Sequence, residues 1–151
     1  MAINKDDLFH NLRSSLYMCR ENVQIIDLSF RRFNQWTGSP EDVDSYYRRS
    51  KKLGPVERDI FDALANGMIN SRDILYVLKQ LIDLENTLEE IEKIVYENPK
   101  KVKGLLINAN NKIDRAYKRL KGKQLVQRHL DRVRAPIMQM RKAIFEYSQG
   151  R

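Results

Sequence analysis

Hydrophobic positions along this chain recur at steps of three and four residues, which is the spacing of amphipathic helices. The longest unbroken series lies in the segment 4–35. Its members are Phe9, Leu12, Leu16, Cys19, Val23, Ile26, Phe30 and Phe33. A seam sustained over four heptads predicts a long helix that packs nearly parallel or antiparallel to other helices. Asn4 is a suitable N-cap for this helix, and Asp6 and Asp7 suit the positive end of its dipole.

The same periodicity predicts further long helices. The segment 70–97 carries Ile74, Val77, Leu81, Leu84, Leu88, Ile91 and Val95, and its first half adds Leu78 and Ile82. A helix that starts at Asn98-Pro99 carries Val102, Leu106, Ala109, Ile113, Ala116 and Leu120. The last seam comprises Val126, Leu130, Val133, Ile137, Met140, Ile144 and Tyr147. The step from Leu120 to Val126 is out of phase, which predicts a bend at Gly122.

Shorter elements connect the first two long helices. Gly38 can take a left-handed cap conformation, and Ser39-Pro40 is an N-cap followed by proline at the first helical position. Gly54-Pro55 opens another helix, with Val56, Ile60, Phe61, Leu64 and Met68 on one face. The pattern therefore predicts an all-α fold: an elongated bundle of long, heptad-patterned, coiled-coil-like helices with one short connecting helix.

Length and composition place limits on this fold. The 151 residues suit one domain, so we expect a single helical domain over 1–151. No apolar run approaches the length of a membrane span, and the first residues lack the pattern of a secretory signal. With one cysteine, Cys19, the chain cannot form an internal disulfide. We expect a protein of the cytoplasm, the nucleus or a particle interior, not a secreted one.

Charge is distributed unevenly along the chain. The formal net charge is +8. Residues 1–98 hold 13 Lys/Arg and 17 Asp/Glu, a net of −4, and residues 99–151 hold 15 and 3, a net of +12. The first part is thus neutral to acidic and the second strongly basic, which predicts an acidic partner such as nucleic acid.

Basic positions in the second part fall on defined helix faces away from the seams. One edge carries Lys101, Lys112, Arg115 and Arg119, and the last helical segment carries Lys121, Arg128 and Arg132 on one side and Lys123, Arg134 and Arg141 on another. Such one-sided arrays suit a phosphate backbone, because each neutralised phosphate releases counterions. The alternatives are a solvated face, or ion pairs with the acidic helix that contains Glu85, Glu89, Glu90 and Glu92.

A second cluster mixes aromatic and basic residues in the segment 46–52. It consists of Tyr46, Tyr47, Arg48, Arg49, Lys51 and Lys52. Aromatic platforms beside cations hold single-stranded nucleic acid without reading its sequence. In the segment 30–36, Phe30 and Phe33 belong to the seam, whereas Trp36, like Tyr46 and Tyr47, is expected to be freer than these core residues. The alternative role of these tyrosines is to cover one end of the bundle.

Catalytic and metal-binding patterns are weak. The histidines, His10 and His129, lie in no metal-ligand motif, and general acid–base catalysis by a lone histidine needs partners that the sequence does not offer. Cys19 lies on a seam, so it is expected to be a small buried side chain and not a nucleophile. We expect no catalytic residue, no metal ligand and no cofactor.

These patterns lead to a functional expectation. The chain is expected to be a non-enzymatic helical binding protein whose basic C-terminal helices contact the phosphate backbone of nucleic acid, or another polyanion, with little sequence specificity. The alternatives are a structural subunit of an oligomer, filament or particle, and an adaptor or inhibitor that binds an acidic protein surface. A homo-oligomer is expected because the first seam needs a partner of equal length, unless the helix over 70–97 supplies it.

Overall fold

The computed structural model describes residues 4–149, and these form helices joined by turns, with no strand among them. The elements in chain order are α1 (Lys5–Arg31), α2 (Pro40–Arg49), the 3-10 turn η1 (Ser50–Lys52), α3 (Pro55–Ala65), α4 (Ser71–Ile94), α5 (Pro99–Arg119), α6 (Gln124–Gln127), the 3-10 turn η2 (Arg128–Leu130) and α7 (Asp131–Gln149). The all-α prediction is confirmed. None of the described helices is long and apolar enough to cross a membrane.

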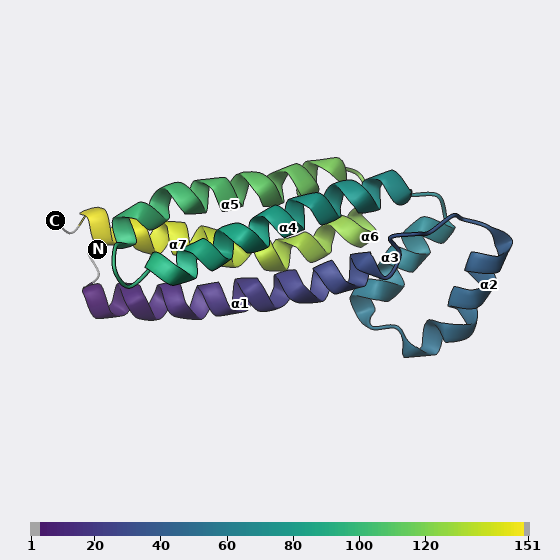
Figure 1. Ribbon diagram of the computed structural model, residues 1–151, viewed down its shortest axis with the longest axis horizontal. Helices are drawn as coiled ribbons and strands as arrows, with labels where there is room; N and C mark the ends of the chain where they lie inside the picture. The colour runs from purple at the N-terminus through teal and green to yellow at the C-terminus, as the bar shows by residue number, and fades with distance from the viewer. Residues whose placement is uncertain (1–3, 150–151) are drawn as a thin grey trace.

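The four long helices α1, α4, α5 and α7 lie side by side and alternate in direction (Figure 1). Helix α1 packs against α7 and α4, and α5 packs against the same two helices from the other side. The start of α1 and the end of α7 therefore lie at one end of the bundle. The long partners that the first seam requires come from this chain itself, so the seam gives no reason of its own for a second copy.

Capping side chains start the helices where the sequence predicts them. The Oδ1 atom of Asn4 accepts the N–H of Asp7 at 2.8 Å, and Asn98 accepts the N–H of Lys101 at 3.3 Å. Asn70 and Asp73 form a reciprocal capping box at the start of α4, with both hydrogen bonds at 3.0 Å. Each cap satisfies backbone donors that the first turn of a helix leaves unpaired.

One helix end differs from the prediction, and a predicted bend is confirmed. Helix α1 ends at Arg31 and not near residue 35, because the N–H groups of Phe33 and Trp36 donate to carbonyls three residues back, which tightens the chain into turns. The expected bend at Gly122 is confirmed: α5 ends at Arg119, and Gly122 has a φ of 80°, which only glycine adopts without strain.

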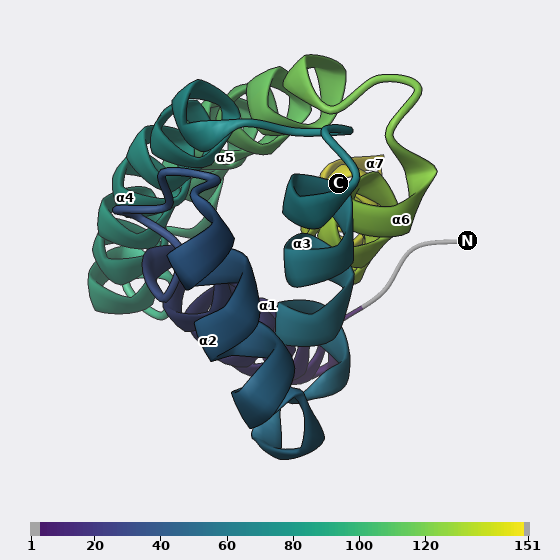
Figure 2. The same cartoon turned by 90° about the vertical axis from the view of Figure 1, so that its right-hand side faces the viewer.

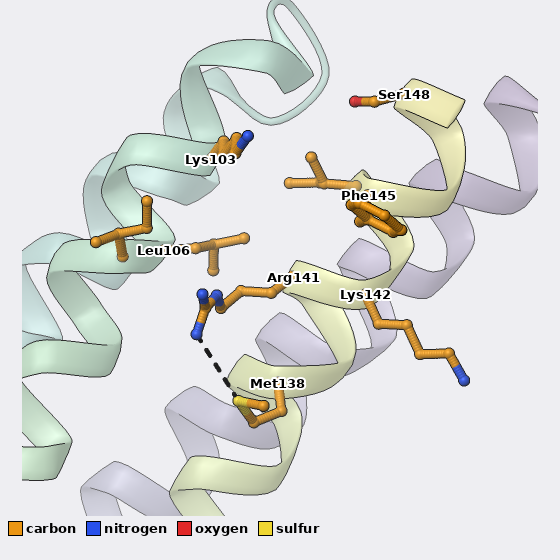
Figure 3. Close-up of a pocket in the computed structure, with 9 residues that line it drawn as sticks. Lys103, Leu106, Met138, Arg141, Lys142, Phe145 and Ser148 are labelled. Atoms are coloured by element: carbon orange, nitrogen blue, oxygen red, sulfur yellow. Dashed lines mark hydrogen bonds between the residues drawn. The ribbon is translucent and has the colours of Figure 1, made fainter. Parts of the chain in front are cut away.

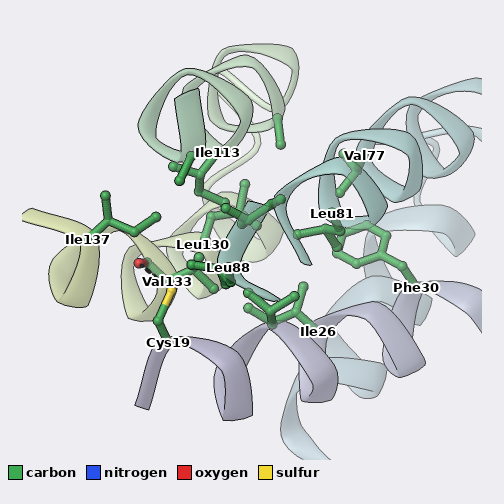
Figure 4. Close-up of a cluster of buried hydrophobic side chains, with 14 of the residues drawn as sticks. Cys19, Ile26, Phe30, Val77, Leu81, Leu88, Ile113, Leu130, Val133 and Ile137 are labelled. Carbon is green, nitrogen blue, oxygen red and sulfur yellow. Dashed lines mark hydrogen bonds between the residues drawn. The ribbon is translucent and has the colours of Figure 1, made fainter. Parts of the chain in front are cut away.

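The core is formed by the four seams, which meet along the bundle axis (Figure 4). Nearly all the predicted seam residues are buried. Four apolar positions differ from the prediction: Leu8 enters the core in place of Phe9, Ile69 is buried in place of Met68, Ile82 is 41% exposed, and Tyr147 is only half-buried. The exceptions lie at helix ends or on a flank, where the direction of the next chain segment decides which side chain is covered.

Helices α2 and α3 lie across one end of the bundle (Figure 2). An aromatic cluster joins them to the end of α1: Phe33 lies 4.7 Å from Tyr46 and 6.5 Å from Phe61, measured between ring centroids. Trp36 packs 5.3 Å from Tyr46 and is only 8% exposed. The expectation that Trp36 and Tyr46 are freer than the core residues is therefore wrong for the buried Trp36 and holds only in part for the half-buried Tyr46, because both rings cover apolar surface that the end of the bundle would otherwise expose to water.

The buried position of Leu81 makes it a test of the core. We predict that Leu81→Asp lowers the free energy of unfolding by about 3–5 kcal/mol, because it removes a buried side chain and places an unpaired carboxylate in an apolar site. The neighbouring Ile82→Asp is the matched control and is expected to cost less than about 1 kcal/mol. Chemical denaturation followed by circular dichroism measures both. Equal stability of the two variants would contradict this core.

Candidate nucleic-acid interface

The predicted stripe on α5 lies along the edge of that helix that faces α4, and its four members have different roles. The Nζ of Lys112 lies 3.7 Å from an Asp83 carboxylate oxygen, and the Nε of Arg119 donates to Asp73 at 2.8 Å. Lys101 and Arg115 are exposed and form no ion pair within residues 4–149. Two of the four predicted cations thus join α5 to α4, and the other two remain accessible to a partner.

Asp73 is a buried carboxylate on which three parts of the chain converge. It accepts the backbone N–H of Asn70, and it also accepts Nε of Arg119 at 2.8 Å and Nζ of Lys123 at 3.2 Å. Burial alone would raise the pKa of Asp73, but hydrogen bonds from Arg119, the Asn70 N–H and Lys123 outweigh burial and lower the pKa from its ordinary 3.8. The contact fixes the turn after α5 to the start of α4, so Arg119 and Lys123 are structural cations.

A second carboxylate, Asp59 of α3, binds basic side chains of the segment before α7. It accepts Arg128 at 2.6 Å and lies 2.6 Å from Nε2 of the buried His129. Burial raises the pKa of Asp59, yet the hydrogen bonds and charges of Arg128 and His129 prevail and lower it. This contact attaches α3, and with it the end of the bundle, to η2.

Arg134 is also engaged within the protein. Its guanidinium lies 3.2 Å from Asp114 of α5, 3.8 Å from Asp131, and 4.0 Å from the centroid of the Tyr117 ring. Of the predicted nucleic-acid-binding cations of the basic part, Lys112, Arg119, Lys123, Arg128 and Arg134 are thus paired with carboxylates. The acids that pair them are aspartates of α3, α4, α5 and α7 and not the glutamates of the acidic helix.

Six of the cations that remain unpaired lie at exposed positions of α5 and of the turn that follows it. Within the described chain, no ion pair involves the members of what we call the α5 basic surface: Lys100, Lys101, Lys103, Arg115, Lys118 and Lys121. Lys100, Lys103 and Lys118 were missing from the predicted set, although all three lie off the seam, Lys100 and Lys118 nearly opposite it. Lys100 and Lys118 are five full turns apart, so they point the same way from positions about 27 Å apart.

In the segment 46–52, some of the predicted residues form contacts within the protein and others remain accessible. Tyr46 is half-buried, and its hydroxyl donates to the Arg32 carbonyl at 2.9 Å, while Arg49 lies 4.8 Å from its ring centroid. Arg48 lies 3.4 Å from Asp44. Tyr47 is 60% exposed, and Lys51 and Lys52 are exposed without an ion pair in the described structure. These three stay accessible.

The structure does not bring the two predicted clusters onto one surface. Helix α2 projects beyond the end of the bundle, whereas α5 runs along its opposite side (Figures 1 and 2). Arg132 of α7 is a further exposed cation without an ion pair in residues 4–149. The accessible cations therefore include the α5 basic surface, a separate group around Tyr47, and Arg132, which lie apart from one another.

Reactive side chains are otherwise buried or isolated. Burial raises the pKa of the Cys19 thiol to about 12, and its Sγ lies 3.7 Å from the Val133 carbonyl oxygen. Among residues 4–149, no group of three or more His, Cys, Asp or Glu side chains could hold a metal ion. Comparisons with models of known protein families, with curated proteins and with solved structures find no match to this chain.

The lowered pKa of Asp73 predicts a pH-dependent contribution to stability. Since the folded-state pKa lies below the ordinary 3.8, the carboxylate stabilises the fold above that pH, and the contribution is lost as pH falls through the folded-state pKa. Asp73→Asn should therefore lower the free energy of unfolding by about 1–3 kcal/mol at pH 7. The difference from the unmodified protein should vanish at acid pH.

Denaturant titrations of both proteins between pH 7 and pH 2 measure this difference. Asp44→Asn is the control, because Asp44 is exposed and forms only a solvated pair with Arg48. A deficit of Asp73→Asn that stayed constant over this range would show that the charge of Asp73 does not matter.

Proposed function

We propose that this chain is a non-enzymatic binding protein whose α5 basic surface contacts the phosphates of nucleic acid or another polyanion, with little sequence specificity. The observation that carries the proposal is the set of six exposed cations on and just after α5 that have no carboxylate partner in the described structure. The one acid of α5, Asp114, is already engaged by Arg134 and Asn110.

The extent of this surface favours a polymeric partner. Lys100 and Lys118 are separated by about 27 Å along the helix, so a small anion can engage only one end of the surface. A nucleic acid presents a phosphate every few ångströms and can engage both ends at once. The exposed Asn108 and Asn111 lie between the cations at the start of α5 and those at its end. Their side-chain amides offer further donors to phosphate oxygens.

The start of α5 supports the same proposal. Helices α1, α2 and α4 carry acidic residues in their first turns, which suit the positive end of the helix dipole. Helix α5 has no acid there, and Lys100 and Lys101, which follow its first residue Pro99, repel that end of the dipole. A bound phosphate would offset this repulsion, so the arrangement gains more from an anionic partner than from water.

A second proposal is that the chain, a bundle whose heptad seams pack in a coiled-coil-like way, is an assembly subunit. The observation that favours it is an apolar group on the solvent side of α1, where Met18, Ile25 and Leu28 are exposed. In this proposal the group is covered by another copy, in an oligomer, filament or particle. In both proposals the protein acts in the cytoplasm, the nucleus or a particle interior.

The salt dependence of binding tests the first proposal. We predict that the protein binds mixed-sequence DNA or RNA at low salt, and that log K falls steeply with log salt. The double variant Arg115→Gln/Lys118→Gln should reduce the magnitude of that slope by about 1.4–1.8, because each phosphate contact contributes about 0.7–0.9. Fluorescence anisotropy at several salt concentrations measures the slopes.

A matched double variant separates this surface from general charge. Arg13→Gln/Lys79→Gln removes the same charge from exposed positions on α1 and α4, and it should leave the slope nearly unchanged. Equal slopes for both double variants would show that α5 is not the contact surface. Absence of binding by the unmodified protein at low salt would overturn the proposal itself.

Tyr47 tests whether the segment 46–52 contributes. If the exposed ring stacks on bases, Tyr47→Ala should weaken binding of single-stranded DNA by about 1–3 kcal/mol, that is about 5- to 150-fold. Duplex binding should not change, since its bases are already stacked. A uniform loss on both ligands, or no loss on either, would rule out stacking at this position.

A further inference from the structure

A groove runs between α5 and α7 near the start of α5, and it differs from the α5 basic surface in chemistry. It encloses about 440 Å³, and the buried Leu106 and Ile144 contribute to its apolar base. Side chains from both helices converge on it (Figure 3). The groove is a trough between the first turns of α5 and the second half of α7, which are antiparallel neighbours.

Large apolar side chains are exposed in this groove. Ile107 is 44% exposed, Met138 54% and Phe145 61%. All three lie off the seams, so the core does not account for them, and clustered exposed apolar residues mark interaction surfaces. Met138 and Phe145 are seven residues apart, two helical turns or about 10.5 Å, so they lie on the same side of α7.

The charge of the groove has one sign. Its lining residues include Lys103, Arg141 and Lys142 and no acid. Lys103 and Arg141 form no ion pair within residues 4–149, and Arg141 makes only a weak contact, 3.9 Å from the Met138 sulfur. Lys142 points away from the groove and lies 3.9 Å from Glu146 (Figure 3). Two unpaired cations, one from each helix, thus border apolar surface.

We propose that this groove binds an acidic amphipathic helix of a partner protein. Such a helix lies along the trough and places apolar side chains at positions i, i+3 or i+4, and i+7 against Ile107, Met138 and Phe145. Its Asp and Glu side chains then reach Lys103 on one side and Arg141 on the other. The aliphatic Ile107 and Met138 favour a protein partner over a nucleic acid, because neither phosphates nor stacked bases gain from exposed aliphatic side chains.

This inference is independent of the proposed nucleic-acid binding. Only Lys103 belongs to both surfaces, so the two functions have separate variants. Phe145→Ser and Arg141→Glu change the groove and leave Arg115 and Lys118 intact. Lys118→Glu is the control matched to Arg141→Glu, because it makes the same charge change at an exposed position outside the groove.

The test uses the full chain and two pools of synthetic 16-residue helical peptides. Both pools vary Leu, Ile, Met and Phe at the i, i+3, i+4 and i+7 positions. The first pool has Glu and Asp on the flanking positions, and the second has Lys and Gln there. Binding is measured by surface plasmon resonance, with thermal melting of each variant to confirm its fold.

The expected result is binding of the acidic pool and not of the basic pool. Phe145→Ser and Arg141→Glu should each reduce that binding at least about tenfold, and Lys118→Glu less than about threefold. Nucleic-acid affinity should respond to Lys118→Glu and not to Phe145→Ser.

Three outcomes would overturn the inference. One is equal binding of the two pools, or binding of neither. Another is that Phe145→Ser weakens binding to vesicles of anionic and neutral lipid but leaves peptide binding unchanged, which would make the groove a membrane contact. The third is a lower oligomeric mass for Phe145→Ser in light scattering, which would make the occupant a second copy of this chain.

Discussion

Joint burial of the four seams is the interaction on which the rest of this structure depends. No one of α1, α4, α5 and α7 can cover its own apolar stripe, and each fully buried Leu or Ile contributes about 1.5–3 kcal/mol only when its neighbours are in place. The bundle in turn fixes the outer faces of the helices. It is the reason that Lys100 and Lys118 point away from the core, and that Ile107, Met138 and Phe145 border one groove.

Two carboxylates, one buried and one half-buried, connect the parts of the chain that the seams leave unfixed. Asp73 joins the start of α4 to the turn after α5, and Asp59 joins α3 to the segment before α7. Each is held by two basic side chains from the C-terminal part, so the acidic and basic parts of the sequence stabilise each other within one bundle. Part of the basic charge therefore stabilises the fold, and only the basic side chains that remain unpaired are available for partners.

That remainder is divided by its surroundings. On the solvent side of α5 the cations stand among polar residues, an environment that suits phosphates. In the groove beside α7, Lys103 and Arg141 border exposed apolar side chains, an environment that suits an acidic amphipathic helix. The same residue types therefore serve different proposals, because what lies between the charges decides which ligand gains from all of them.

The sequence by itself determined the all-α class, nearly all of the core, the helix starts and the break at Gly122, since these follow from local periodicity, capping and backbone sterics. It also located the basic part of the chain. Only the tertiary structure decided which cations are structural: Arg119 and Arg115 look alike on α5, yet the former meets Asp73, 46 residues away in the sequence, and the latter meets solvent. Likewise, the sequence shows that Ile107, Met138 and Phe145 are apolar residues outside the heptad seams. It does not show that they border one groove. Periodicity gives the direction of a side chain from its own helix axis, whereas its partners depend on which helices lie side by side and how far each is shifted along the bundle.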